Sequence, residues 1–145
     1  MKASSLRLAT LTALALVLTL PRIASAADPC KLLTADEVAP VIGSSVSPNP
    51  FGNNGCMWGN GLQRVILMLG DASTWSQIAA PAPNITKTDV SGIGDAAFFG
   101  GGFGTWTLTV KQGNDVISLV VIGAKTPDLQ NSSEQTLAKL ALKRL

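Results

Sequence analysis

The sequence has no histidine and no tyrosine, and it has only two cysteines in 145 residues. Catalysis by a Ser-His-Asp or Cys-His arrangement needs an imidazole as general base, so the absence of histidine excludes both in their usual form. The same absence excludes zinc sites with histidine ligands. An enzyme built on this chain would therefore depend on its nine Asp and Glu residues. We predict no metal site and no cofactor.

The first 26 residues have the order of a secretory signal. Lys2 and Arg7 supply a positive start, residues 8–20 are uncharged and rich in Leu, Ala and Thr, and Ala24-Ser25-Ala26 offers small residues at a cleavage point. This order predicts a signal peptide, residues 1–26, that is cleaved after Ala26. The alternative is a membrane anchor, which needs about 20 apolar residues and therefore a longer run. We expect a periplasmic or secreted protein of the bacterial envelope, with no membrane span after cleavage.

The mature part, residues 27–145, has the length of a single domain and is slightly acidic. Three of the eleven basic residues lie within residues 1–26, which leaves eight basic against nine acidic residues. Nucleic-acid binding requires Lys and Arg clustered on one face. The one cluster is Lys139, Lys143 and Arg144, where the dipole of a C-terminal helix favours cations. We therefore exclude nucleic acid as a partner.

Both cysteines, Cys30 and Cys56, lie in the mature part. In an oxidising compartment an even pair is far more often a bridge than two thiols, so we predict a Cys30–Cys56 disulfide. Bridged sulfurs offer no thiolate nucleophile. Together with the missing histidine, the bridge indicates that the protein is not an enzyme.

The helix signals are strongest near the start of the mature part. Thr34 and Glu37 form a capping box, and Gly43 supplies a C-terminal stop. Pro40 removes one backbone hydrogen bond, so this helix should be short, kinked or partly 3₁₀. The pattern predicts helices over residues 35–42, 73–80 (capped by Ser73) and 132–144, and a loop over 44–55.

The strand signals are strongest in the hairpin of residues 105–122. Trp106, Leu108 and Val110 alternate with threonines, so they point inward and the threonines toward water. Residues 63–69 are apolar on both faces, which predicts a central strand covered on both sides. Strands are expected over residues 56–58, 63–69, 95–99, 105–111 and 116–122. The fold class is therefore α+β: an antiparallel sheet of about five strands with helices packed on it, and one disulfide.

Three segments together resemble a known group: Asp28-Pro29-Cys30, Gly55-Cys56-Met57-Trp58 and Val90-Ser91-Gly92-Ile93-Gly94-Asp95-Ala96-Ala97-Phe98. The chain is similar to uncharacterised small secreted proteins and lipoproteins, common in actinobacteria, that share a DPC…GCxW…GxGDxA pattern. The resemblance spans most of the mature part and implies a Cys30–Cys56 bridge and a sheet sandwiched by helices. The lipobox cysteine of many members is missing here. The family carries no established activity.

Asp89 and Asp95 flank a turn that contains Gly92 and Gly94. Two carboxylates about 5–10 Å apart can hydrolyse glycosides. Aspartates near turns more often bond backbone N–H groups, and we favour that role. A carboxylate-dependent hydrolase of cell-wall glycans is the alternative.

Aromatic residues surround a glycine run in residues 98–106. Phe98 and Phe99 point to opposite faces of a strand, so we expect one of them to be exposed. We expect residues 100–104 to form a loop that carries Phe103 at its surface. Phe99, Phe103 and Trp106 are the candidate binding residues, because aromatics dominate interface hot spots. For any one of these aromatics we favour the alternative, a place in the core, because large apolar residues are mostly buried.

These observations predict an exported, non-enzymatic envelope protein that binds a partner protein or a small apolar ligand. Two alternatives stay open. One is the glycan hydrolase, and the other is a secreted inhibitor or immunity-type protein that blocks an enzyme with the Phe103 loop. The sequence gives no oligomeric state.

Overall fold

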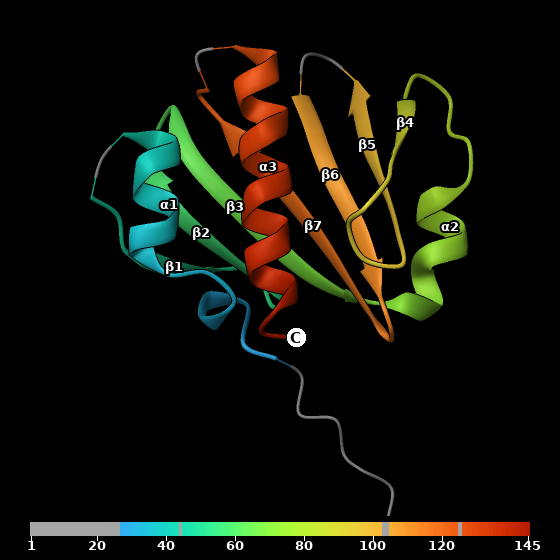
Figure 1. Ribbon diagram of the computed structural model, residues 1–145, viewed down its shortest axis with the longest axis horizontal. Coiled ribbons are helices and arrows are strands. Elements are labelled where there is room, and N and C mark those ends of the chain that lie inside the picture. Colours follow the sequence, from blue (N-terminus) through green and yellow to red (C-terminus); the bar gives the residue numbers. More distant parts are fainter. Residues whose placement is uncertain (1–26, 44, 103–104, 125) are drawn as a thin grey trace, which may run out of the picture.

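The structure is a computed structural model that describes residues 27–43, 45–102, 105–124 and 126–145. The predicted signal peptide and Phe103 lie outside the described residues. The elements follow in this order (Figure 1), with η for a 3₁₀ helix: η1 (Pro29–Lys31), α1 (Ala35–Ile42), β1 (Pro48–Phe51), β2 (Gly55–Asn60), β3 (Gln63–Asp71), η2 (Ala72–Thr74), α2 (Trp75–Ala79), β4 (Thr86–Val90), β5 (Ala96–Gly102), β6 (Thr105–Gln112), β7 (Asp115–Ile122) and α3 (Pro127–Leu142).

The strands form one antiparallel sheet in the order β1-β2-β3-β7-β6-β5-β4. Two runs of consecutive strands, β1 to β3 and β4 to β7, are joined where β3 pairs with β7. The predicted α+β class with an antiparallel sheet and helices is confirmed. The described sheet has seven strands rather than about five, because two strands that were not predicted, β1 and β4, form its edges.

The two edge strands have sequences that do not read as strands. The predicted loop over residues 44–55 is wrong in part, because β1 lies within it and carries Pro48 and Pro50. Proline has no N–H to donate, and an edge strand tolerates it because one side of the strand has no partner. Strand β4 is mostly polar and exposed, so it lacks the alternation that indicates a half-buried strand.

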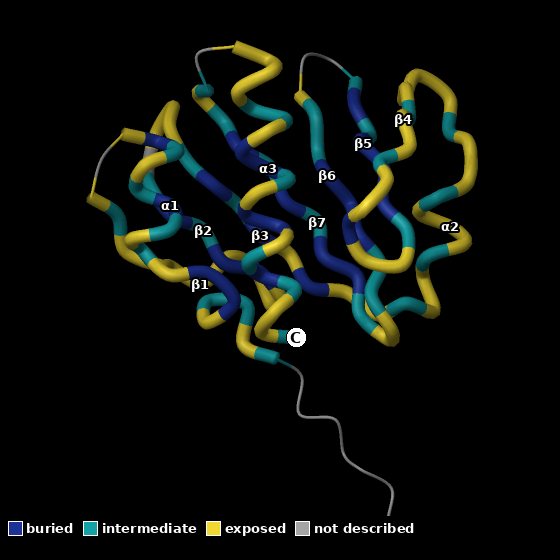
Figure 2. Tube along the Cα trace, viewed as in Figure 1, coloured by how far each residue is buried: buried dark blue, intermediate teal, exposed yellow. Residues whose placement is uncertain are grey.

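Helices α1 and α3 pack on one face of the sheet and enclose the main core (Figure 2). Trp58 and Cys56 point into this core from β2, as their period of two predicts. The buried apolar residues of the core are Leu32, Leu33, Val38, Ile42, Cys56, Trp58, Val65, Leu67, Leu69, Ile93, Ala97, Phe99, Leu108, Val110, Ile117, Leu119, Val121, Leu137, Ala138 and Ala141.

Helix α1 has the predicted bounds and the predicted capping box. The backbone N–H of Thr34 donates to Glu37 Oε2 at 2.8 Å, and the backbone N–H of Glu37 donates to Thr34 Oγ1 at 3.3 Å. The helix includes Pro40 and ends at Gly43, whose φ of 72° is left-handed. A residue with a side chain would be strained there, which explains the glycine.

The other two helices differ from their predicted bounds. Helix α3 begins at Pro127 rather than at residue 132, because the Thr126 side chain accepts from the Leu129 N–H and caps an earlier start. The segment 73–80 splits into η2 and α2, and the cap of η2 is Asp71, not Ser73. A carboxylate accepts the Ser73 N–H at 2.7 Å and so takes the place of the serine hydroxyl.

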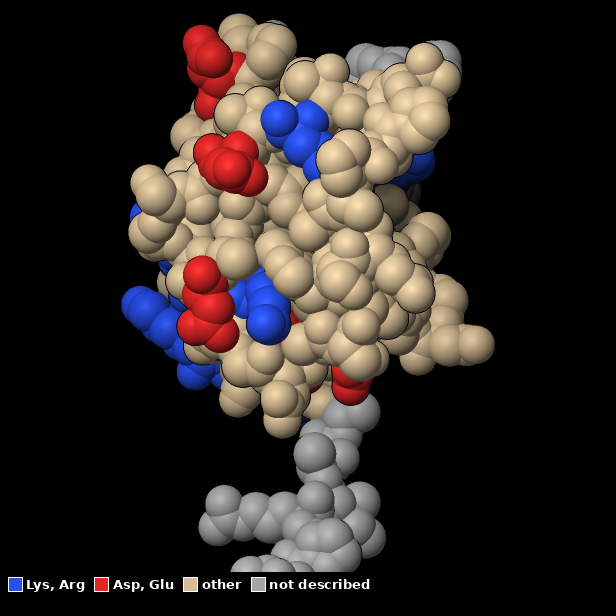
Figure 3. Space-filling model, turned by 90° about the vertical axis from the view of Figure 1, so that its right-hand side faces the viewer, with Lys and Arg blue, Asp and Glu red and all other residues tan. Residues whose placement is uncertain are grey.

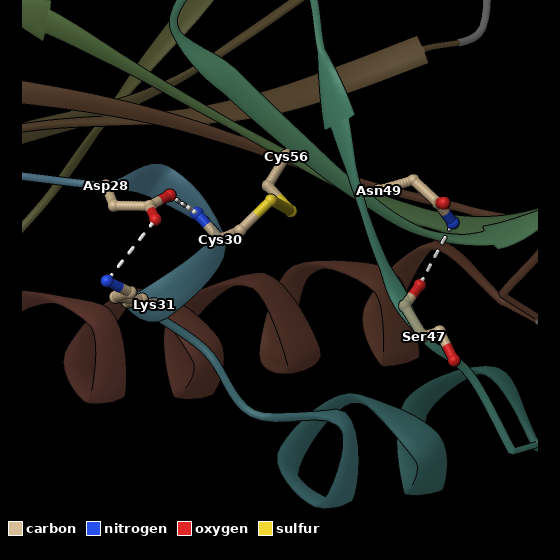
Figure 4. Close-up of a disulfide and its surroundings, with 6 residues drawn as sticks. All are labelled: Asp28, Cys30, Lys31, Ser47, Asn49 and Cys56. Carbon is tan, nitrogen blue, oxygen red and sulfur yellow. Dashed lines mark hydrogen bonds and ion pairs between the residues drawn. A yellow bond between two sulfur atoms is a disulfide. The ribbon is translucent and has the colours of Figure 1, made fainter.

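The predicted Cys30–Cys56 disulfide is confirmed (Figure 4). It joins η1 to β2 with a Cα–Cα distance of 5.0 Å. The Asp28 side chain accepts from the Cys30 N–H at 3.0 Å and caps η1 at the start of the described chain. The bridge therefore fixes the N-terminal segment to the sheet beside the buried Trp58.

Candidate functional site

The sheet face opposite α1 and α3 carries apolar side chains that no described helix covers. Met57, Ile66 and Val120 lie opposite one another on β2, β3 and β7, and Met68 and Ile122 extend this row on either side. Met68 is 39% exposed and the other four are half-buried. We call these five residues the open sheet face.

Strand β3 shows the contrast between the two faces. Val65 and Leu67 point toward α1 and α3 and are fully buried, whereas Ile66 and Met68 point away and remain partly accessible. The prediction that β3 is covered on both sides is therefore wrong. An apolar run indicates burial on both faces only when an element is present on each side.

Helix α2 covers the far end of this face, over β4 and β5. Trp75 of α2 packs on Phe98, with 5.6 Å between ring centroids. Lys87 lies 5.0 Å above the same ring, and its Nζ donates to the backbone oxygens of Ile78 and Ala80 at the end of α2. Lys87 therefore holds the short helix in place, since these oxygens have no partner further along the helix.

A groove of about 340 Å³ separates α2 and the segment after it from β6. Its walls are Ile78 and Ile85 on one side and Thr107 and Thr109 on the other, and Phe98 also lines it. Ile78 is 37% exposed and Ile85 is 47% exposed. The Thr109 and Ser118 hydroxyls, 3.4 Å apart, connect this groove across β6 and β7 to the open sheet face.

The charged strand residues on this side are mostly basic. The strand register places Arg64, Lys87 and Lys111 on the same side of the sheet as the open sheet face. Among the described strand residues, Asp89 is the acidic residue on that side. Figure 3 views the molecule from the α2 end and shows scattered charges of both signs rather than a patch of one sign.

A second hollow, of about 720 Å³, lies where β3 ends and β7 begins. Asp71 and Asp115 are direct register partners there, and Asn53, Asn54 and Ala27 complete part of the lining. The Ser73 hydroxyl and N–H lower the pKa of Asp71 below its usual range. A glycosidase pair needs one carboxyl with a raised pKa to act as the acid, so the shift at Asp71 has the wrong sign for that role.

Asp95 and Asp89 have different surroundings. The Asp95 carboxylate accepts from the Gly113 N–H at 2.7 Å, and its own N–H donates to Lys111 O. Asp95 thus holds the turn between β6 and β7. Asp89 lies exposed on β4, opposite Phe98. Asp95 therefore bonds a backbone N–H, as expected, but this N–H belongs to the β6–β7 turn rather than to the turn that contains Gly92 and Gly94.

The predicted binding aromatics lie mainly in the core. Phe99 is 7% exposed within the core, and Phe98 is 6% exposed beneath α2, so the expectation that one of them is exposed is wrong. Trp106 is half-buried against the same core. Residues 100–102 belong to β5 instead of a loop, which corrects that part of the predicted 100–104 loop. Phe103 lies outside the described residues.

Glu134 was not predicted as a functional residue, and its side chain is fully buried between α3 and the sheet. Burial raises the pKa of Glu134 to about 7, and N–H groups of Val121, Gln130 and Leu108 offset part of this effect. The helical spacing of the sequence does indicate that Glu134 is buried. Glu134 stands three residues before Leu137 and four before Ala138, on the buried stripe of α3.

No protein-family model, no curated protein and no solved structure matches this chain. Within the described ranges, no helix is long and apolar enough to cross a membrane. The same residues contain no group of three or more Cys, Asp or Glu side chains arranged to hold a metal ion.

Proposed function

We propose that this chain is an exported, non-enzymatic binding protein that docks a partner protein on the open sheet face and the adjoining α2 groove. One observation carries the proposal. Two helices, α1 and α3, cover one face of the seven-stranded sheet, whereas the five-residue α2 is the described helix on the other face.

The exposed apolar residues support a docking role. Met68, Ile78 and Ile85 are three of the six large hydrophobic residues that are exposed in the described structure, and all three lie on this side. A sheet face normally packs against a second layer. Contiguous apolar surface with a polar rim is typical of interaction sites.

The charges around the open sheet face support a partner of acidic character. Arg64, Lys87 and Lys111 outnumber Asp89 on this side, although the mature part as a whole carries one more acid than base. Complementary charges favour docking and suppress wrong partners. The proposed partner is therefore a protein surface with apolar side chains at its centre and carboxylates around them.

Peptide display against the immobilised protein tests this proposal. Selected peptides should combine apolar residues with Asp or Glu. Their affinity should fall at least about tenfold for Ile66→Asp, which places a charge at the centre of the contact. It should also fall for Arg64→Glu combined with Lys111→Glu. Leu62→Asp is the matched control, because Leu62 is 87% exposed outside the open sheet face and should bind like the wild type.

Three results would contradict the proposal. Peptides that bind equally to Ile66→Asp would place the contact elsewhere. A small apolar molecule that co-purifies from the envelope, and is lost in Ile85→Asp, would favour a small-ligand site in the α2 groove. Turnover of a glycan that disappears in Asp89→Asn or Asp95→Asn would favour the hydrolase.

A further inference from the structure

Strands β6 and β7 part before their hydrogen-bonded ladder is complete. Their two-residue turn makes every second register pair a hydrogen-bonded one, as for Gln112 with Asp115, Val110 with Ile117 and Leu108 with Leu119. The next such pair would be Trp106 with Val121, but the pairing ends at Leu108. Figure 1 shows the two strands diverging beyond this point, with α3 lying across the gap. We call this gap the β6–β7 fork.

Two side chains of α3 replace the missing ladder bonds. The Val121 N–H donates to Glu134 Oε1 at 2.9 Å, and Gln130 Nε2 donates to the backbone oxygen of Trp106 at 3.2 Å. Gln130 Nε2 also donates to Glu134 Oε1 at 3.0 Å. The donor and the acceptor that the ladder would have paired are thus joined through Gln130 and Glu134.

The second carboxyl oxygen of Glu134 has no such partner. Oε2 is buried and makes no hydrogen bond within the described residues. A charged carboxylate in this position would keep one buried oxygen without a hydrogen bond, which is costly in a low-dielectric interior. The neutral carboxyl carries no net charge and avoids most of this cost, so burial in the fork favours the neutral form.

Charged residues on the surrounding elements do not stabilise either form. These are Lys111 on β6, Asp115 on β7, Asp128 and Lys139 on α3, and Asp36 and Glu37 on α1. None of them is among the groups that shift the pKa of Glu134, which burial and three N–H donors determine. The protonation of Glu134 therefore depends on its burial in the β6–β7 fork.

We propose that Glu134 is a protonation switch of the β6–β7 fork: neutral Glu134 holds the ends of both strands to α3, and its ionisation releases them. The raised pKa of about 7 places this change near neutral pH. Because folding raises the pKa of Glu134, the neutral carboxyl contributes its full stabilisation of the closed fork below pH 4.5. This stabilisation is lost as the pH rises through 7. The switch does not depend on the docking proposal.

Hydrogen exchange of the purified, disulfide-bonded protein tests the switch. After correction for intrinsic exchange rates, the protection of the Val121 amide should fall on the order of 30-fold between pH 5.5 and 8.5, if opening returns the Glu134 pKa from about 7 to 4.5. The Leu67 amide on β3 should keep its protection. Glu134→Gln mimics the neutral carboxyl and should abolish the pH dependence at Val121. Asp128→Asn, an exposed position on the same helix, should preserve it.

A second measurement keeps the test independent of whether Glu134→Gln folds. The side-chain carboxyl carbon of Glu134 can be titrated by nuclear magnetic resonance in the wild type. A midpoint near 7 supports the switch, and a midpoint near 4.5 overturns it. Protection of Val121 that is the same at both pH values, or that varies with pH in Glu134→Gln as in the wild type, also overturns it.

Discussion

At the scale of single residues, Arg144 connects the two ends of the described chain. Its Nη1 donates to Leu32 O and to Glu37 Oε2, both at 2.9 Å, and its Nη2 donates to Glu37 Oε1 at 2.8 Å. Glu37 also accepts the Thr34 N–H in the capping box. One carboxylate therefore caps α1 and binds the C-terminus, and the hydrogen bonds from Arg144 contribute most to lowering its pKa to about 2.

Arg144→Lys should lower stability modestly, because an ammonium cannot make the paired contact with both carboxylate oxygens. The difference from the wild type should be largest above pH 4.5 and shrink as the pH falls toward 2, since the lowered pKa of Glu37 stabilises the fold only while Glu37 is charged. Urea unfolding at pH 7 and at pH 2 measures both effects. Lys143→Ala, the exposed neighbour, should change little. A difference that is as large at pH 2 as at pH 7 would contradict this explanation.

At the scale of elements, those with strong local signals were predictable from the sequence. Helix α1 follows from its capping box and from Gly43, and the β6–β7 hairpin follows from alternation and a glycine turn. Strand β1 was missed because its prolines are tolerated only through its place at the edge. That place depends on pairing with β2, which no local pattern reveals.

The glycines of β5 show how tertiary packing can reverse a local signal. A glycine run suggests a loop, yet Gly101 lies beneath the Trp106 ring, where an added Cβ would stand 2.5 Å from ring carbons. Gly102 lies close to the backbone of Asn84, whose oxygen would stand 2.8 Å from an added Cβ. These glycines permit close approach within the sheet. The same packing places Trp106 against the core, so its aromatic character did not indicate an exposed binding residue.

The candidate site was the least predictable part. Ile66 and Met68 have the sequence of a strand buried on both faces, and only the short length and position of α2 leave them accessible. Glu134 has no distinctive neighbours in sequence. Its role arises because β6 and β7 part beneath α3, which is a property of two strands and a helix together.

The disulfide acts at the element scale, since it ties η1 to β2 across 26 residues. Replacing both cysteines, Cys30→Ala with Cys56→Ala, should lower the free energy of unfolding by roughly 3–4 kcal/mol on the chain-entropy account of a loop of this length. Urea unfolding measures the loss. The wild type under reducing conditions should unfold like the variant. Equal stability of the variant and the oxidised wild type would show that the bridge adds nothing to the fold.

At the scale of the whole molecule, the two faces of the described sheet differ in how they are covered. Helices α1 and α3, the disulfide and Arg144 all stabilise one face of the sheet. The other face keeps its apolar strand residues partly accessible. Val120 and Ile122 of the open sheet face flank Val121 of the β6–β7 fork, so release of the fork would move part of the proposed docking surface.

Export and cleavage of the whole chain are predicted from the sequence of its first 26 residues. Because Ala24 and Ala26 are small residues after an apolar run, we expect export followed by cleavage after Ala26. The intact mass of protein from the periplasm or the medium should match a chain that begins at Ala27.

Two variants test this cleavage against its alternative. Ala24→Arg places a large charged side chain where the peptidase requires a small one, so the variant should keep residues 1–26 and remain in the inner membrane. Ser25→Ala, at the position between the two small residues, should be cleaved like the wild type. If residues 8–20 are instead a permanent anchor, the wild type itself will be recovered at full length in the membrane. Its mass will then match that of Ala24→Arg apart from the substituted side chain.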